Sequence, residues 1–323
     1  MATMPIPLPT NGFGLMRKVV PDERAFPVLA TAIRQGATVW SIATHYGTPD
    51  ENSLHLMKRY FSARPEDAPK VTLCLRAGVV SIDKMDCSPA NMRRSLEVAL
   101  DILGGTKSID LYGPGRVDPN VAIEHTVREV ARLVAQGLVK GIVLSEVSAA
   151  TIRRAAAVHS IAAVETEVSL WAREVFDNGV ASTCKELGIP ILAYSPLGRG
   201  MLAGNFANLD DVANGEFHSM YPRFQAGQFE QNLELVRAVQ KLATQKGCTS
   251  AQLALAWLRY KGGETGMPAI IPVPGARSQE RVEENYGPIV LSPAEMDRIQ
   301  AVLDEFPVAG ERYPEAAARF LEY

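Results

Sequence analysis

Short apolar runs recur along the chain, and amphipathic segments separate them. Within each run aliphatic or β-branched residues follow one another with little polar alternation, which is typical of parallel strands that are buried on both faces. Eight such runs are present, at residues 12–16, 38–42, 71–75, 109–112, 141–145, 161–165, 189–194 and 269–274.

The segments between these runs have the spacing of amphipathic helices. In residues 23–36, Phe26, Leu29 and Ile33 fall on one helical face, and Gly36 follows as a stop signal. Residues 91–105, 123–137 and 179–188 end in glycine in the same way. Strands that alternate with helices eight times predict an α/β fold closed into a (β/α)8 TIM barrel.

Two segments depart from the repeat. Residues 203–230 form a long polar insertion after the seventh predicted strand. It is either a flap over the catalytic face or a surface loop, and the sequence leaves both open. The last predicted helix, residues 292–305, is followed by a tail, residues 306–323. Because no linker or shorter repeat interrupts the pattern, we expect residues 1–323 to form one domain.

The composition excludes several classes of partner. A net charge of −3 and a pI near 6.0 give no reason to expect nucleic acid or membrane binding. The N-terminus lacks a signal peptide pattern, so we expect a cytoplasmic protein. The four cysteines, Cys74, Cys87, Cys184 and Cys248, lack metal-site or disulfide spacing, which predicts reduced thiols and no metal. The oligomeric state stays open.

Six segments resemble the landmark segments of aldo-keto reductases, in the same order and at ordinary spacing. They are residues 38–47, 71–78, 109–118, 141–148, 193–202 and 271–285, and the likeness extends over residues 11–315. Residues 144–155, 162–173 and 189–204 are most similar to the pyridoxal reductase group of yeasts and fungi. The resemblance implies NADPH-dependent reduction of an aromatic aldehyde such as pyridoxal, with the C-terminal tail over the barrel mouth.

The catalytic positions depart from the pattern of that family. The family has a tetrad of Asp, Tyr, Lys and His, and the aligned residues here are Ser41, Tyr46, Arg76 and Gly115. A phenol with a pKa of about 10 is a weak acid and needs a nearby cation to lower its pKa. We therefore expect Tyr46 to donate the proton and Arg76 to assist it.

The exchange of Asp for Ser41 removes the carboxylate that would neutralise this cation. Ser41 and Arg76 together carry a charge of plus one, which predicts an electropositive pocket that favours an anionic substrate group. The alternative is that Arg76 pairs with another acid on the rim of the barrel.

The missing histidine leaves two questions. His45, next to Tyr46, is a candidate to replace it, although a lone histidine in a loop is more often a surface residue. The small Gly115 predicts a larger pocket, which would suit a bulky or ring-shaped substrate. We expect Met16 and Trp171 to line that pocket.

The cofactor site looks more complete than the catalytic one. Gly275 lets the backbone approach a phosphate, and Arg277 suits the 2′-phosphate of NADPH. Arg281 adds positive charge near the phosphate or ribose. By the resemblance, Glu284 and Asn285 hold the adenine amino group.

The remaining cofactor positions lie at other strand ends. By the resemblance, Tyr194 stacks on the nicotinamide ring, Ser145 and Glu165 bind its carboxamide, and Gly14 borders the pyrophosphate. The positions that wrap the pyrophosphate are Ser195, Leu197 and Arg199.

Three functions are consistent with this pattern. The first is an NADP(H)-dependent reductase of a small-molecule carbonyl, in general or secondary metabolism. The second is an isomerase, dehydratase or cyclase that uses Tyr46, Arg76 and His45 on the same scaffold. The third is a non-catalytic NADP(H)-binding protein. Consumption of NADPH separates the first two.

Overall fold

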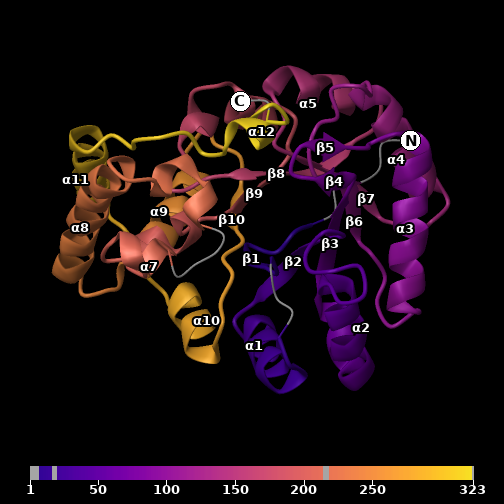
Figure 1. The fold of residues 1–323 in the computed structure, drawn as a ribbon, viewed down its shortest axis with the longest axis horizontal. Coiled ribbons are helices and arrows are strands. Elements are labelled where there is room, and N and C mark those ends of the chain that lie inside the picture. The colour runs from indigo at the N-terminus through magenta and orange to yellow at the C-terminus, as the bar shows by residue number, and fades with distance from the viewer. Residues whose placement is uncertain (1–6, 17–19, 214–217, 322–323) are drawn as a thin grey trace.

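The chain folds as a nearly closed barrel of eight parallel strands with helices around it. The computed structural model describes residues 7–16, 20–213 and 218–321. Over these residues the strand order is β1-β2-β3-β6-β7-β8-β9-β10, and the helices lie outside the strands (Figure 1). The first and last strands meet where the Gly14 N–H donates to the Pro274 carbonyl at 3.1 Å. The predicted (β/α)8 barrel is confirmed.

Each predicted strand is present, with bounds shifted by a few residues at most. The barrel strands are β1 (Asn11–Gly14), β2 (Ala37–Ala43), β3 (Thr72–Ala77), β6 (Leu111–Pro114), β7 (Gly141–Ser145), β8 (Ile161–Glu167), β9 (Ile191–Tyr194) and β10 (Ile270–Pro272). A small antiparallel hairpin, β4 (Val79–Ser81) with β5 (Lys84–Met85), follows β3 and was not expected from the sequence.

The helices connect the strands and pack on the outside of the barrel. The α-helices are α1 (Asp22–Arg34), α2 (Ser53–Ala63), α3 (Pro89–Leu103), α4 (Ile123–Ala135), α5 (Ala149–Ala156), α6 (Val180–Glu186), α7 (Leu209–Ala213), α8 (Gln228–Lys246), α9 (Ser250–Gly263), α10 (Gln279–Tyr286), α11 (Pro293–Glu305) and α12 (Glu315–Ala318). The 3-10 helices are η1 (Pro65–Lys70), η2 (Glu174–Phe176), η3 (Gly198–Ala203), η4 (His218–Met220) and η5 (Pro222–Phe224).

Glycines end the helices that the pattern predicted. Gly36, Gly104, Gly137 and Gly188 have φ values of 71°, 57°, 73° and 67°. This left-handed backbone conformation has a low free energy for glycine, which lacks a Cβ, and it turns the chain toward the next strand. The stop signals in the sequence are therefore confirmed.

Side chains that point into the barrel form layers. One apolar layer takes one buried residue from each of seven strands: Val39, Cys74, Leu111, Val143, Ala163, Leu192 and Ile271. Because side chains alternate along a strand, the residues two positions later also point inward, nearer the C-terminal ends. Ser41, Arg76, Ser145 and Glu165 occupy that next layer, directly above the apolar one, and all four are buried.

The insertion and the tail are both partly ordered into short helices. The insertion of residues 203–230 contains α7, η4 and η5, although residues 214–217 lie outside the described part of the chain. The tail turns back toward the barrel at Arg312 and Tyr313, which contact Glu146 and Tyr194. Its last two residues, 322 and 323, are also outside the described part.

Candidate active site

Arg76 and Tyr46 contact each other at the C-terminal end of the barrel. Arg76 comes from β3, and its Nη2 donates to Tyr46 Oη at 2.6 Å. The guanidinium carbon lies 5.4 Å from the centre of the tyrosine ring. The cation and the phenol that the sequence placed together are therefore in hydrogen-bond contact.

A carboxylate from another strand neutralises this cation. Glu165 of β8 lies 2.9 Å from Arg76 through Oε2 and Nε, and its Oε1 accepts from Ser41 Oγ at 2.9 Å. Arg76 Nη2 also donates to Ser41 Oγ at 2.8 Å. Hydrogen bonds and an ion pair thus join all three side chains, and each of them is buried.

This arrangement corrects one expectation from the sequence. The unpaired positive charge expected at Arg76 is wrong, because Glu165 supplies the acid that Ser41 lacks, as the alternative of a pairing with another acid allowed. Glu165 Oε1 accepts from Ser41, whereas Oε2 faces Arg76 as an ion pair and accepts no hydrogen bond from the described residues, so the expected contact of Glu165 with a cofactor carboxamide stays a prediction. The inward position of Glu165, two residues after buried Ala163, was the sequence signal that could have indicated its pairing with Arg76.

The environment of Tyr46 pulls its pKa in opposite directions. Burial raises the pKa of Tyr46 above its ordinary value, and Glu165 raises it further, while Arg76 and Arg116 lower it. The net direction is upward, whereas the sequence had suggested a lowered pKa. The phenol is therefore protonated at neutral pH, as a proton donor must be.

His45 lies beside the tyrosine but stays neutral. The two rings are 4.9 Å apart at 75°. Desolvation and the charges of Arg76 and Arg116 lower the pKa of His45 to about 3. Part of the residue faces solvent, which limits the desolvation, but the two guanidinium groups act in the same direction whatever the exposure. His45 is thus a neutral imidazole at physiological pH.

The space beside Gly115 is filled, which corrects the expectation of an enlarged pocket. A Cβ on Gly115 would lie 2.9 Å from Val79 Cγ2 and 3.4 Å from the Ala77 carbonyl. Val79 belongs to the β4–β5 hairpin, so this hairpin occupies the room that a side chain at position 115 would need. Gly115 is itself buried.

Arg116, the next residue, points into the same region and was missed by the sequence reasoning. Its Nη1 donates to the Gly115 carbonyl at 2.6 Å and to Ser145 Oγ at 3.3 Å, and its Nη2 donates to Tyr313 Oη at 3.1 Å. A rim arginine directly after an aligned catalytic position was the available signal.

The positions expected to bind cofactor phosphate bring two backbones together. A Cβ on Gly14 would lie 2.8 Å from the Val273 carbonyl and 3.6 Å from Gly275 N. Gly275 is exposed, and a Cβ there would meet only the Gly14 carbonyl, at 3.2 Å. Because neither glycine has a side chain, the two backbone segments come close together. A phosphate group could reach the backbone there.

The helix that follows carries the other expected cofactor residues. Ser278 caps α10, and Arg277 before it is exposed. Arg281 is ion-paired with Glu284 at 2.6 Å, so its charge is partly used within the helix. Asn285 is buried, and its carbonyl accepts from Arg259 at 3.0 Å. The binding of a dinucleotide by these residues and the two glycines stays a prediction, and Arg277 is the exposed cation of this segment.

The segment after β9 contains strained backbone and a buried ion pair. Ser195 and Arg199 have φ values of 47° and 55°, and Leu197 packs against the core. Arg199 is paired with Glu167 at 2.9 Å, and both side chains are buried. The guanidinium of Arg199 is thus bound to Glu167, and the expected role of Ser195, Leu197 and Arg199 around the pyrophosphate stays a prediction.

The C-terminal tail closes over the expected nicotinamide position. Tyr313 Oη lies 2.8 Å from Tyr194 Oη. Arg312 pairs with Glu146 at 2.7 Å, and Glu146 has a φ of 52°. Burial alone would raise the pKa of Glu146, but Arg312 and Arg116 lower it to about 2. No local sequence signal indicated these long-range contacts of the tail.

The two expected pocket residues differ in exposure. Met16 is 41% exposed after β1. Trp171 is buried, packs edge-on against Phe224 at 5.5 Å, and has an indole N–H without a hydrogen-bond partner among the described residues. In this conformation Trp171 does not line open space.

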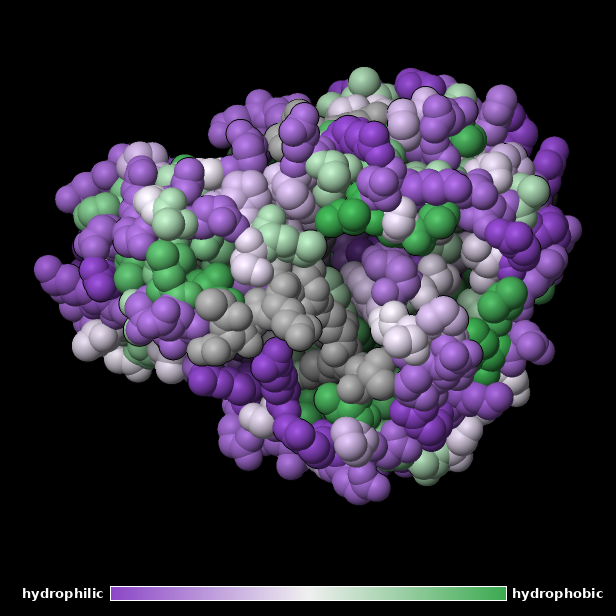
Figure 2. Space-filling view, in the orientation of Figure 1, coloured by the Kyte–Doolittle hydropathy of each residue, from purple (hydrophilic) through white to green (hydrophobic). Residues whose placement is uncertain are grey.

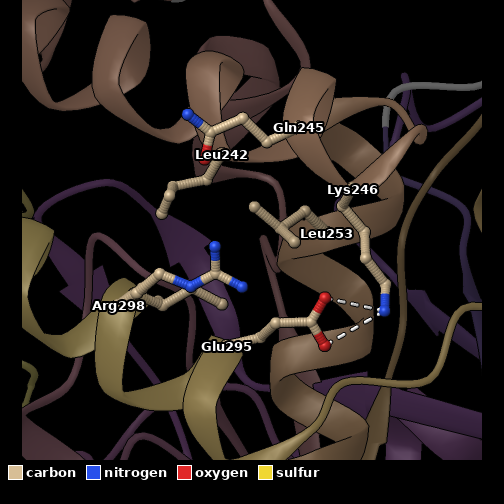
Figure 3. A pocket seen from close by; sticks show the side chains of 7 residues that line it. Leu242, Gln245, Lys246, Leu253, Glu295 and Arg298 are labelled. Carbon is tan, nitrogen blue, oxygen red and sulfur yellow. Dashed lines mark hydrogen bonds and ion pairs between the residues drawn. The ribbon is translucent and has the colours of Figure 1, made fainter.

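Figure 2 shows a hollow near the centre of one face of the molecule. Two pockets lie outside the catalytic cluster. A small pocket of about 40 Å³ borders α8, α9 and α11, where Lys246 pairs with Glu295 at 2.8 Å beside Arg298 (Figure 3). A larger groove of about 630 Å³ lies at the opposite, N-terminal ends of β9 and β10. Neither pocket includes a catalytic candidate.

The part of the chain that the structure describes lacks two further features. No helix there is long and apolar enough to cross a membrane. No group of three or more His, Cys, Asp or Glu side chains there could hold a metal ion.

Comparison with known proteins identifies the relatives of this chain. Residues 6–304 match the model of the aldo/keto reductase family. A protein of Schizosaccharomyces pombe, described as probable pyridoxal reductase 2, is 34% identical over 319 residues, which cover 96% of this chain and 94% of that protein.

Solved structures share the fold at lower sequence identity. A glycerol dehydrogenase from Gluconobacter oxydans superposes with a TM-score of 0.78 at 20% identity, covering 96% of this chain and 95% of the other. A thermostable aldo-keto reductase in complex with the inhibitor epalrestat gives a TM-score of 0.70 at 22% identity, covering 91% and 95%.

Proposed function

The chain belongs to the aldo/keto reductase family, and from this premise we propose that it is an NADPH-dependent reductase of an aromatic aldehyde such as pyridoxal. Membership of the family supports carbonyl reduction with a nicotinamide cofactor. The choice of an aromatic aldehyde is supported by the name of the 34% identical relative. The choice of NADPH is supported by exposed Arg277 at the start of α10.

The observation that carries the proposal is the 2.6 Å contact between Arg76 and Tyr46. NADPH, when bound, supplies the hydride to the carbonyl carbon. Tyr46 gives its proton to the carbonyl oxygen, which yields the alcohol and leaves a tyrosinate. Arg76 stabilises that tyrosinate through the existing hydrogen bond and then stays charged while solvent returns the proton.

Glu165 and Ser41 have the task of holding Arg76 in place. The carboxylate compensates the buried guanidinium, which would otherwise be costly to keep out of water. Ser41 accepts from Arg76 and donates to Glu165, so it fixes the relative orientation of the two charges. In this chain the acid that neutralises the catalytic cation comes from β8 instead of β2.

The experiment follows the absorbance of NADPH with purified protein and pyridoxal, beside the variant Tyr46→Phe. We expect steady oxidation that falls by at least about a hundredfold in the variant, which keeps the ring but lacks the proton. NADPH binding without oxidation of any aromatic aldehyde would contradict the proposal. It would instead support a non-reductive reaction or a binding protein on this scaffold.

A further inference from the structure

Four arginines surround the C-terminal mouth of the barrel, and three of them have a carboxylate partner. Arg76 pairs with Glu165 at 2.9 Å, Arg199 pairs with Glu167 at 2.9 Å, and Arg312 pairs with Glu146 at 2.7 Å. In each of these pairs both side chains are at least nine-tenths buried. The three glutamates are thus committed to three of the four cations.

Arg116 is the fourth cation, and within the described residues no carboxylate lies at ion-pair distance from it. Its partners are neutral: the Gly115 carbonyl, the Ser145 hydroxyl and the Tyr313 hydroxyl. These three bonds use three of the five N–H groups of a guanidinium, so two have no hydrogen-bond partner among the described residues. The positive charge that the sequence suggested at Arg76 is therefore carried by Arg116.

The surroundings of Arg116 place it in the same mouth as the proton donor. Its guanidinium carbon lies 5.9 Å from the ring centre of Tyr194 and 5.5 Å from that of Tyr313. Its charge also lowers the pKa of Tyr46, which burial raises. It lowers the pKa of His45 as well, in the same direction as burial. Arg116 is half-buried, and the carboxylate whose charge acts on it, Glu146, is already paired with Arg312 at 2.7 Å. An anion that binds at Arg116 would therefore give this guanidinium a charged partner in direct contact.

From these contacts we propose that Arg116 binds an anionic substituent, a carboxylate or phosphate, of the substrate whose carbonyl meets Tyr46. Guanidinium groups match both kinds of oxyanion with paired hydrogen bonds. The phosphates of the cofactor are assigned to the segments after β9 and β10, whereas Arg116 follows β6, so the anion belongs to the substrate. This specificity role rests on the proposed reductase function.

The test compares matched pairs of aldehydes in the wild type, Arg116→Met and Arg116→Lys. One pair is benzaldehyde and 4-carboxybenzaldehyde, and the other is pyridoxal and pyridoxal 5′-phosphate, so the pairs separate a carboxylate from a phosphate. For at least one pair, we expect the ratio of kcat/KM, anionic over neutral, to fall by about tenfold or more in Arg116→Met, mainly through KM. Arg116→Lys should restore part of the ratio, because it keeps the charge.

A ratio that stays within about twofold of wild type for both pairs would overturn the proposal. Taking a ratio within one variant cancels any common loss of cofactor binding or folded protein. An equal loss on neutral and anionic aldehydes leaves the ratio unchanged and would therefore also overturn the proposal.

Calorimetry separates failure of this proposal from failure of the reductase function. If no aldehyde is reduced, the reductase proposal fails, and titration of wild type and Arg116→Met with benzoate and with inorganic phosphate still tests the anion site. We expect binding of one of these anions to weaken by about tenfold or more in the variant. If neither anion has a different dissociation constant in wild type and in Arg116→Met, the anion site is refuted.

Discussion

Arg76 contacts the three side chains that decide the chemistry of the mouth: Ser41 at 2.8 Å, Tyr46 at 2.6 Å and Glu165 at 2.9 Å. An arginine does not release its proton under these conditions, so it acts as a fixed charge. Tyr46 supplies the proton, and its pKa responds to the charges around it. The balance between Arg76, which lowers this pKa, and Glu165, which raises it, is therefore open to measurement.

The first prediction concerns the pH dependence of the wild-type enzyme. Reduction requires protonated Tyr46, whose pKa is raised, so kcat should stay level through neutral pH and fall only above about pH 10. His45, with a pKa lowered to about 3, should add no step near its ordinary pKa. Initial rates of pyridoxal reduction across the pH range check this. Loss of activity with a midpoint near about pH 6.5 would assign a role to a titrating histidine instead.

The second prediction concerns Glu165→Gln. Removing the negative charge leaves Arg76 to lower the pKa of Tyr46 further, so the alkaline fall of kcat should move to lower pH. The variant should also lose about 3–5 kcal/mol of stability, because it breaks a buried ion pair. The pH profile of kcat and urea unfolding measure the two effects.

Ser41→Ala is the matched control for this variant. It removes a hydrogen-bond partner of Arg76 and Glu165 but leaves both charges, so the alkaline fall should stay close to that of the wild type. An alkaline limb that does not move in Glu165→Gln would mean that Glu165 has no electrostatic influence on Tyr46.

At the scale of elements, the register of the strands determines the site. The residues two positions beyond the apolar layer point inward near the C-terminal ends of the strands. One buried side chain from each of β2, β3, β7 and β8 therefore lies in a common layer. In the proposed function, loops and the helix α10 supply the cofactor side. The first turn of α10 and the exposed Arg277 before it stand where a phosphate can approach.

The third prediction tests this cofactor loop. Arg277→Met should lower the preference for NADPH over NADH, measured as the ratio of kcat/KM, by about tenfold or more. Arg281→Met should have a smaller effect, because Arg281 is already paired with Glu284 at 2.6 Å. A wild-type enzyme that prefers NADH, or equal losses with both cofactors in Arg277→Met, would remove Arg277 from the cofactor site.

Much of the barrel could be predicted because its signals are local. Apolar runs mark all eight barrel strands, and the glycines after the helices adopt the expected left-handed conformation. The β4–β5 hairpin was missed because its two strands are only three and two residues long. Its Val79 fills the space beside Gly115, so the size of the pocket could not be inferred from the glycine alone.

The catalytic cluster was predictable only in part. The sequence placed Tyr46 with Arg76, and the structure brings them into contact. The pairing of Arg76 with Glu165 joins strands that are far apart in the chain, and only their shared inward register indicates it. The contacts of Arg312 and Tyr313 depend on how the tail folds back, which no local pattern encodes.

At the scale of the whole molecule, family membership, the barrel fold and the residues at its mouth all support the proposed reduction of a carbonyl group. At the mouth, Tyr46, the proposed proton donor, contacts Arg76, a cation that Glu165 neutralises. Another arginine of the mouth, Arg116, donates its hydrogen bonds to neutral partners among the described residues. The central claim is that this mouth transfers a hydride from NADPH to a carbonyl carbon and that Tyr46 supplies the proton.

Transfer of deuterium tests that claim most directly. Purified protein is incubated with pyridoxal and NADPH that carries deuterium at C4 of the nicotinamide. Two cofactors are used, each labelled on one of the two faces, and the mass of the alcohol is measured by mass spectrometry. We predict one deuterium in the alcohol from one of the two cofactors, and almost no product in Tyr46→Phe. Two results would contradict the account. One is alcohol that contains no deuterium with either cofactor, and the other is conversion of the substrate to a product without oxidation of NADPH.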